Sequence, residues 1–355
     1  MKTQLATMTE TDSKIKVLVV DDAAFMRRAV ADILSSDDGI EVVETARDGL
    51  DGLAKVEALR PDVITLDIDM PRMDGLTTIR HLMIEAPVPI VVLSSLAGDG
   101  AITFEALRLG VVDFVPKPSG AVSADIDQAR QNLIDRVKMA SAVNMHNIRR
   151  VQLLSPPTDG EGEADGKAPL DYLVTLGTTL GGPNTVIRLI SQLPPDLPAA
   201  VVVVQEIAPK VIDDFVRRFD EQVPWKVAVG RDGEVLQAGA CYLSPLGAGL
   251  EVGTNAEGLP CLIAKGPSDE PLNALFTSAA NVFHQNTVGV LLTGTGNDGA
   301  DGLAQIQNAS GVSMAQAVDT CVYPNLTDNA INLGVADVIL EEPQLPEAIT
   351  ALMEE

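Results

Sequence analysis

A glycine-rich loop and a downstream carboxylate give this sequence two parts of a hydrolytic site. The loop Gly177-Thr-Thr-Leu-Gly-Gly182 follows a short apolar run and precedes a helix-like stretch, so it can present the hydroxyl of Thr179 at a strand end. Gly296-Asn-Asp-Gly299 places the carboxylate of Asp298 after another apolar run. A hydroxyl nucleophile needs a base to remove its proton. The histidines of the chain lie away from this loop, at His81, His146 and His284. Two plainer interpretations stay open: the loop is a tight turn without chemistry, and Asp298 is a helix N-cap.

A second group of polar residues follows the apolar runs in the first third of the chain. Its members are Asp21, Asp22, Asp67, Ser94 and Lys117. The carboxyl ends of strands in an open parallel sheet share one crevice, so we expect these side chains to meet there. Neighbouring carboxylates repel one another unless a cation joins them, and oxygen ligands favour a hard ion, above all Mg²⁺. Lysine and serine can bind an anion attached to one carboxylate. The set therefore indicates phosphoryl transfer onto an aspartate.

A purely structural interpretation of this group also exists. Asp21 and Asp22 would cap the next helix, and Lys117 would be a solvated side chain. This interpretation is disfavoured, because suitable residues at the ends of several different strands would then coincide by chance.

Short apolar runs alternate with helix-period stretches along the first part of the chain. The expected strands are Ile15–Val20, Ile40–Thr45, Asp62–Leu66, Ile90–Leu93 and Val112–Val115. The expected helices are Ala24–Leu34, Gly49–Leu59, Leu76–Ile84, Thr103–Leu109 and Ala124–Met139. This alternation predicts a doubly wound, flavodoxin-like parallel sheet with helices on both faces.

A second α/β series begins at Pro169. It follows a stretch rich in glycine, proline and acidic residues (155–166), which is typical of a flexible linker. The expected strands are Tyr172–Leu176, Ala199–Val204, Ala240–Leu243, Val288–Leu292 and Ser313–Ala315, with an antiparallel hairpin around Ala240–Ile263. The expected helices are Asn184–Ser191, Val211–Glu221, Leu272–Val282 and Gly302–Asn308. We therefore predict a disordered N-terminus (1–14), a first domain (15–140), a linker (141–168) and a second α/β domain (169–355).

Composition limits the compartment and the partners. The net charge of −25 argues against nucleic acid as a main partner, although acidity can also serve solubility alone. Cys241, Cys261 and Cys321 form neither a disulfide framework nor a CxxC metal motif, so a reducing cytosol fits best. The first residues lack an apolar signal core, and no apolar run reaches the ~18 residues that a membrane span needs. We expect a soluble cytoplasmic protein without membrane insertion.

The first domain resembles the receiver domain of response regulators. The matching segments are Val19-Val-Asp-Asp22, Asp67-Ile-Asp-Met-Pro-Arg-Met-Asp-Gly75, Ser94-Ser95 and Asp113-Phe-Val-Pro-Lys-Pro118. The resemblance implies phosphorylation of Asp67 by a histidine kinase. It also implies a Mg²⁺ site made by Asp21, Asp22, Asp67 and the backbone carbonyl near Asp69. Ser94 and Lys117 would then bind the phosphoryl group, and Phe114 would be the switching aromatic residue.

The second domain resembles the chemotaxis methylesterases of the CheB type. Their segment Gly-Ala-Ser-Thr-Gly-Gly corresponds to Gly177–Gly182, and Ala240–Pro245 and Val288–Asp298 match as well. Family members hydrolyse methyl esters on chemoreceptor glutamates, and many deamidate receptor glutamines, by means of a serine, a histidine and an aspartate. Carried over by position, the aspartate is Asp298, the serine position holds Thr179 and the histidine position holds Glu206.

These two replacements weaken the expected chemistry. The extra methyl group of threonine restricts the side-chain rotamer and crowds the path of attack. A glutamate has an unperturbed pKa of about 4.3 and is a poor base towards a hydroxyl. Thr295 and the segment Glu270-Pro-Leu-Asn-Ala274 also depart from the family pattern, which has methionine and Arg-Pro-Ser-Val-Asp there.

Two functions are consistent with these residues. In the first, a signalling protein phosphorylated on Asp67 controls an effector domain with impaired hydrolase activity. That domain would bind chemoreceptor tails, a kinase or another partner, or the protein would drain phosphoryl groups as a phosphate sink. In the second, the chain is an active methylesterase and glutamine deamidase with a Thr179/Glu206/Asp298 site. We favour the first on chemistry. A DNA-binding response regulator is disfavoured by the charge and by the lack of a helix-turn-helix segment.

Overall fold

The computed structural model describes residues 14–94, 100–117, 124–148, 151 and 169–353. These residues fall into two compact units, one within 1–96 and 114–142 and the other within 97–113 and 143–355. Of the predicted linker (141–168), residues 141–148 and 151 are described, whereas its stretch 155–166 lies outside the described residues, as does the N-terminal segment 1–13. In the described part of the chain, no helix is long and apolar enough to cross a membrane.

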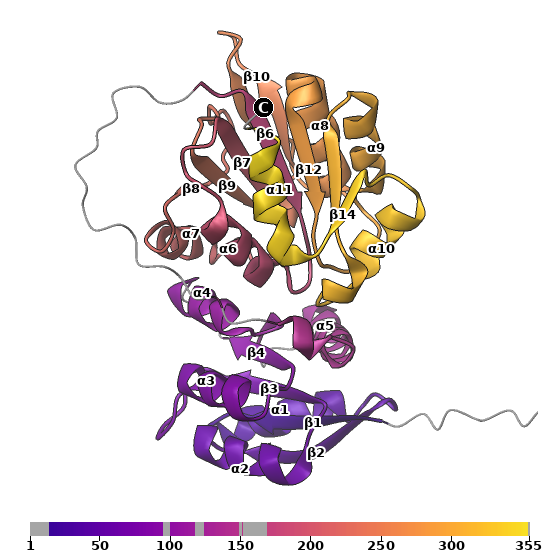
Figure 1. Ribbon diagram of the computed structural model, residues 1–355. Helices are drawn as coiled ribbons and strands as arrows, with labels where there is room; N and C mark the ends of the chain where they lie inside the picture. The colour runs from indigo at the N-terminus through magenta and orange to yellow at the C-terminus, as the bar shows by residue number, and fades with distance from the viewer. Residues whose placement is uncertain (1–13, 95–99, 118–123, 149–150, 152–168, 354–355) are drawn as a thin grey trace, which may run out of the picture. The chain divides into compact units, whose positions relative to one another are not determined.

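The first unit is built on a five-stranded sheet with the strand order β2-β1-β3-β4-β5 (Figure 1). The strands are β1 (Ile15–Val20), β2 (Ile40–Ala46), β3 (Val63–Asp67), β4 (Ile90–Ser94) and β5 (Asp113–Pro116). The helices are α1 (Ala24–Leu34), α2 (Gly49–Leu59), α3 (Gly75–Glu85) and α5 (Ala124–Ser141), while α4 (Gly100–Leu109) is grouped with the second unit. Helix α1 contacts α5 and α2 contacts α3, so the expected doubly wound parallel sheet is confirmed.

The register of the central strands brings the ends of β1 and β3 together. Val20 pairs with Leu66, so Asp21 and Asp67 follow at neighbouring positions on the same edge of the sheet. Every residue of β3 is buried, which explains why its apolar run is continuous instead of alternating. Two aspartates start the following helices: the carboxylate of Asp48 accepts from the N–H of Asp51 in α2, and that of Asp74 accepts from Thr77 in α3.

The second unit contains a seven-stranded parallel sheet with the order β14-β13-β12-β6-β7-β9-β8. Its strands are β6 (Tyr172–Gly177), β7 (Ala199–Gln205), β8 (Lys226–Val229), β9 (Ala240–Pro245), β12 (Thr287–Leu291), β13 (Val312–Gln316) and β14 (Val338–Leu340). Strands β10 (Leu250–Thr254) and β11 (Pro260–Ala264) form a separate antiparallel hairpin. The predicted hairpin is therefore present, and β9 belongs to the parallel sheet beside it.

Helices cover both faces of this larger sheet. They are α6 (Gly182–Gln192), α7 (Ile212–Asp220), α8 (Pro271–Phe283), α9 (Ala300–Asn308), α10 (Asn325–Asn332) and α11 (Leu345–Ala351). One core cluster joins Val202 and Val204 of β7 to Leu275 and Phe276 of α8 and to Leu303 of α9. Because side chains alternate along a strand, the other residues of β7 face the opposite side. Because the strands of the sheet are parallel, the loops after β6, β7 and β12 lie at the same edge of the sheet.

Candidate functional sites

The first candidate site is an acidic pocket at the carboxyl edge of the smaller sheet. Carboxylate oxygens of Asp21, Asp22 and Asp67 all lie within 4.8 Å of one another. Asp21 and Asp67 are buried, whereas Asp22 is exposed and leaves the pocket open to solvent. Backbone groups orient the buried carboxylates: the Ala23 N–H donates to Oδ1 of Asp21 and the Ile68 N–H donates to Oδ1 of Asp67, both at 2.8 Å. A compact group of oxygens of this kind fits a hard divalent cation.

Lys117 supplies the positive charge of this pocket. Its Nζ lies 2.9 Å from Oδ2 of Asp21 and 2.7 Å from Oδ2 of Asp67. Burial works to lower the pKa of Lys117, but the two carboxylates outweigh it and the pKa is raised, so the side chain stays charged. Burial, together with repulsion from Asp21, raises the pKa of Asp67 despite the attraction of Lys117. A further cation beside Asp67 would favour its charged form.

Three other residues were predicted for the receiver site: Asp69, Ser94 and Phe114. Asp69 is exposed in the loop between β3 and α3, and Phe114 is half-buried in β5. Ser94 ends β4, but its side chain lies outside the described part of the structure. The structure thus brings Asp21, Asp22, Asp67 and Lys117 together as expected, and the roles of the other three residues remain predictions.

The second candidate site lies at the carboxyl edge of the larger sheet. Thr179 follows β6, Glu206 follows β7 and Asp298 lies in the loop after β12, and these three strands are adjacent in the order β12-β6-β7. All three side chains are half-buried. This is the edge at which open α/β sheets bind their ligands, so the positions inferred by resemblance lie in the appropriate crevice.

The hydroxyl of Thr179 is held by the backbone of Thr295. Its Oγ1 accepts from the Thr295 N–H at 2.6 Å and donates to the Thr295 carbonyl at 3.1 Å. The carbonyl oxygen cannot serve as a general base at neutral pH, so this contact provides no acceptor for the hydroxyl proton. Gly294 fits closely against the same group, because a Cβ there would lie 2.4 Å from Oγ1 of Thr179. The sequence shows the Thr295 replacement but not this contact.

Asp298 caps helix α8 with both carboxylate oxygens. Oδ2 accepts from the Leu272 N–H at 2.7 Å and Oδ1 accepts from the Asn273 N–H at 3.0 Å, while Glu270, the N-cap residue itself, makes no side-chain cap. Burial raises the pKa of Asp298, assisted by repulsion from Glu270, while these N–H groups and that of Gly299 work to lower it. Asp298 therefore caps a helix, which was the plainer interpretation of this residue. The helix that it caps is α8, which precedes Asp298 in the chain, and not α9, which follows it.

Helix α9 is capped by a side chain from α8. The side-chain oxygen of Asn273 accepts from the N–H groups of Gly299 and Gly302, at 3.0 and 2.8 Å. Asp298 and Asn273 therefore cap each other's helices. Each oxygen of Asp298 accepts from one backbone N–H, so the carboxylate is held in one orientation while each oxygen keeps a second lone pair.

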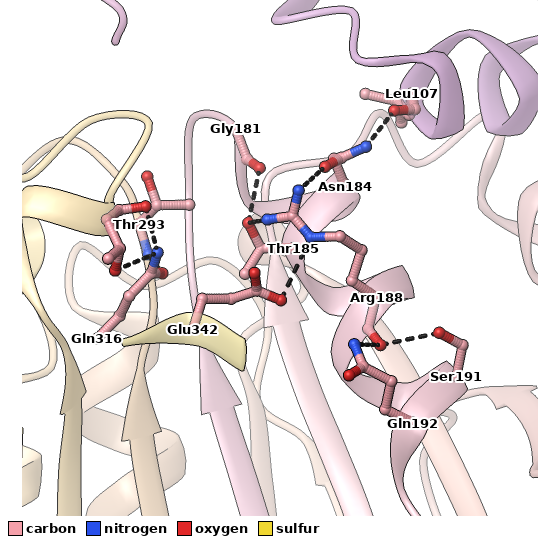
Figure 2. A network of polar contacts seen from close by, with 11 residues as sticks. Leu107, Gly181, Asn184, Thr185, Arg188, Ser191, Gln192, Thr293, Gln316 and Glu342 are labelled. Atoms are coloured by element: carbon pink, nitrogen blue, oxygen red, sulfur yellow. Dashed lines mark hydrogen bonds and ion pairs between the residues drawn. The ribbon is translucent and has the colours of Figure 1, made fainter. Parts of the chain in front are cut away.

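A buried polar network anchors helix α6, which follows the Gly177–Gly182 loop. Figure 2 shows the guanidinium of Arg188 between Asn184, Thr185 and Glu342, with the pair Arg188–Glu342 at 3.2 Å and both side chains buried. The loop itself is tied to the β12 side by the Thr178 hydroxyl, which donates to the Thr293 carbonyl at 2.5 Å. Gln316 in turn accepts from the Thr293 N–H (Figure 2). These contacts hold the loop at both ends, and no sequence pattern indicated the Arg188–Glu342 pair.

Comparison with known proteins agrees with both halves of this description. Residues 17–125 match the response regulator receiver domain, and residues 174–349 match the CheB methylesterase. A protein-glutamate methylesterase/protein-glutamine glutaminase from Symbiobacterium thermophilum is 39% identical, over 95% of this chain and 96% of that protein. The one from Geobacillus kaustophilus is 38% identical, over 96% and 99% respectively. The crystal structure of the Thermotoga maritima CheB methylesterase catalytic domain is 28% identical, covering 51% of this chain and 98% of that one, with a TM-score of 0.48.

Proposed function

Because the chain belongs to the CheB family of chemotaxis response regulators, with a receiver domain and a methylesterase domain, we propose that it is phosphorylated on Asp67 by a histidine kinase. The acidic pocket supports this proposal. Asp67, like Asp21, is a buried carboxylate beside the cation Lys117 and two further carboxylates, and the resemblance to receiver domains selects Asp67 as the acceptor. One oxygen of Asp67 would form the new bond to phosphorus while the bond from phosphorus to the donor's histidine nitrogen breaks.

The residues of the pocket divide the work of this transfer. Mg²⁺ bound by Asp21, Asp22 and Asp67 would neutralise charge on the phosphoryl oxygens. Lys117, now 2.7 Å from Asp67, would move its ammonium group onto a phosphoryl oxygen once that carboxylate is esterified. The Ile68 N–H keeps the other oxygen of Asp67 in place during the reaction. Ser94 and Phe114 would sense the modified state.

We infer further that the effector domain has impaired hydrolase activity. The observation that carries this inference is the hydroxyl of Thr179, which is fixed between the N–H and the carbonyl of Thr295. Glu206 stands where the family has its histidine, and Asp298 is engaged at the start of α8. Without an imidazole the proton of the hydroxyl has no efficient acceptor. The domain would then act by binding, with chemoreceptor tails as its first partner, or the protein would act as a phosphate sink.

The alternative is an active methylesterase and glutamine deamidase with a Thr179/Glu206/Asp298 site. One observation favours it: relatives that match this chain over nearly their full length bear the name protein-glutamate methylesterase/protein-glutamine glutaminase.

Methanol release from methylated chemoreceptor separates the two functions. The assay uses the full chain with Asp67 phosphorylated and a Thr179→Ala variant as the control. Impairment predicts no release above the control; turnover that disappears in Thr179→Ala contradicts impairment. The double variant Thr179→Ser/Glu206→His restores the family residues, and release by this variant would show that the rest of the site is intact. Phosphorylation itself is checked with the Asp67→Asn variant, which should take up no phosphate from a phosphorylated kinase.

A further inference from the structure

The loop from Ile68 to Asp74 connects the phosphorylation site to helix α3. It starts next to Asp67 and contains Asp69, whose carbonyl is the expected backbone ligand of the metal. An inference about this loop rests on the proposed function, because it concerns how the same pocket holds its cation.

The base of the loop is closed by Gly75. Its N–H donates to the carbonyl of Ile68 at 2.8 Å. A Cβ at this position would lie 2.5 Å from the Asp67 carbonyl oxygen and 2.6 Å from Cα of Ile68, so only glycine fits. The two ends of the loop are therefore fixed relative to the sheet.

The tip of the loop is held from another part of the chain, the turn between β2 and α2. The N–H of Gly49 donates to the Met73 carbonyl at 3.3 Å, and a Cβ on Gly49 would lie 2.8 Å from the Met73 side chain. Next to this contact, the guanidinium of Arg72 forms an ion pair with Asp48. Asp48 is a fixed anchor, because its side chain is 1% exposed and also caps helix α2.

Arg72 adopts a backbone conformation that an arginine rarely has. Its φ is +67°, in the left-handed region that disfavours side chains with a Cβ. Such a conformation is unfavourable for a residue with a Cβ and persists where surrounding contacts enforce it. The turn around Arg72 is closed by the Met73 N–H, which donates to the Pro71 carbonyl at 2.8 Å, and the ion pair with Asp48 connects this turn to the start of α2.

We propose that Arg72 and Asp48 are positioning residues for the divalent cation, because their ion pair fixes the tip of the loop whose Asp69 carbonyl completes the ligand set. Neither residue touches the ion in this assignment. Their effect is to hold the loop in one conformation before the cation arrives, which removes an ordering cost from binding.

The test measures the affinity of the unphosphorylated full-length protein for Mg²⁺ by isothermal titration calorimetry. Arg72→Asn removes the guanidinium and keeps a residue that tolerates positive φ. Asp48→Asn removes the charge and keeps an equally good helix cap. Arg47→Ala is the matched control, since Arg47 also approaches Asp48, at 4.0 Å, but lies outside the metal loop.

We expect Arg72→Asn and Asp48→Asn each to weaken Mg²⁺ binding by about tenfold. The double variant should lose no more than either single variant, because both break the same contact. For Arg72 the direction is diagnostic: removing a positive charge near a cation site strengthens cation binding by electrostatics alone. Arg47→Ala should therefore bind Mg²⁺ as well as the wild type or slightly better.

Three outcomes would overturn the proposal. Unchanged or tighter binding by Arg72→Asn would show that the loop needs no such support. Full additivity in the double variant would show that the two residues act separately, and equal weakening by Arg47→Ala would show that the loss does not depend on the metal loop. A wild-type protein that binds no Mg²⁺ would instead overturn the proposed phosphorylation chemistry along with this inference.

Discussion

Replacing Asp298 by alanine removes the acceptor for the backbone N–H groups of Leu272 and Asn273 at the start of α8. Loss of a side-chain cap costs about 1–2 kcal/mol, and half-buried donors left without partners add about 1–3 kcal/mol. Part of this cost is offset, because burial of the carboxylate raises its pKa and is itself unfavourable. We therefore expect Asp298→Ala to lower the free energy of unfolding of the second unit by about 2 kcal/mol, which corresponds to a decrease in Tm of about 4–8 °C.

The assay is urea unfolding followed by tryptophan fluorescence. Trp225 is the only tryptophan in the chain, is 1% exposed and donates its indole N–H to the Leu193 carbonyl, so its emission reports unfolding of the second unit. Asp301→Ala is the control, because Asp301 is an exposed acid in the first turn of α9 and should cost less than about 1 kcal/mol. Equal, small losses in both variants would refute the capping role. Asn273→Ala should reproduce the effect of Asp298→Ala through the start of α9.

Three other predictions follow from described contacts. Arg188→Met alone should destabilise the second unit by about 3–5 kcal/mol by leaving Glu342 buried without its partner, and adding Glu342→Leu should recover most of this loss in the same fluorescence assay. Lys117→Met should tighten Mg²⁺ binding several-fold in calorimetry, since the ammonium competes for oxygens of Asp67. Burial raises the pKa of Cys321 from its ordinary value of 9.0 to about 11, so between these two pH values the thiol is protonated in the folded protein and loses its proton on unfolding. The free energy of unfolding of the wild type minus that of Cys321→Ala should be constant below pH 9. It should fall by about 3 kcal/mol as the pH rises through 11.

Elements with a local signal were predictable from the sequence. Helices α1 and α2 occupy the predicted ranges Ala24–Leu34 and Gly49–Leu59, and β1 occupies Ile15–Val20. Asp48 before α2 supplies an N-cap, which fixes where that helix begins. Strands β8 and β14 and helices α10 and α11 were not anticipated. β14 has three residues and none of them is fully buried, so its apolar pattern is too short to stand out.

The acidic pocket could be predicted because topology alone creates it. Asp21 and Asp67 each follow a buried parallel strand, and parallel register brings the strand ends together. The second site could not be predicted to the same depth. The contacts of Thr179 with Thr295 and of Asp298 with Leu272 depend on how separate loops approach one another, and single-sequence patterns carry no such distances. The resemblance in sequence pointed to Thr179, Glu206 and Asp298, and the structure adds the contacts of Thr179 and Asp298.

The reciprocal caps of Asp298 and Asn273 affect how members of this family can be sorted by sequence. An aspartate that begins a helix is retained by selection for a folded domain even after hydrolysis has ceased. Its presence in a relative with the same α8–α9 arrangement is therefore poor evidence of an active enzyme. A survey for non-hydrolytic members should therefore be based on the positions of Thr179 and Glu206, at which this sequence departs from the serine and histidine expected by resemblance.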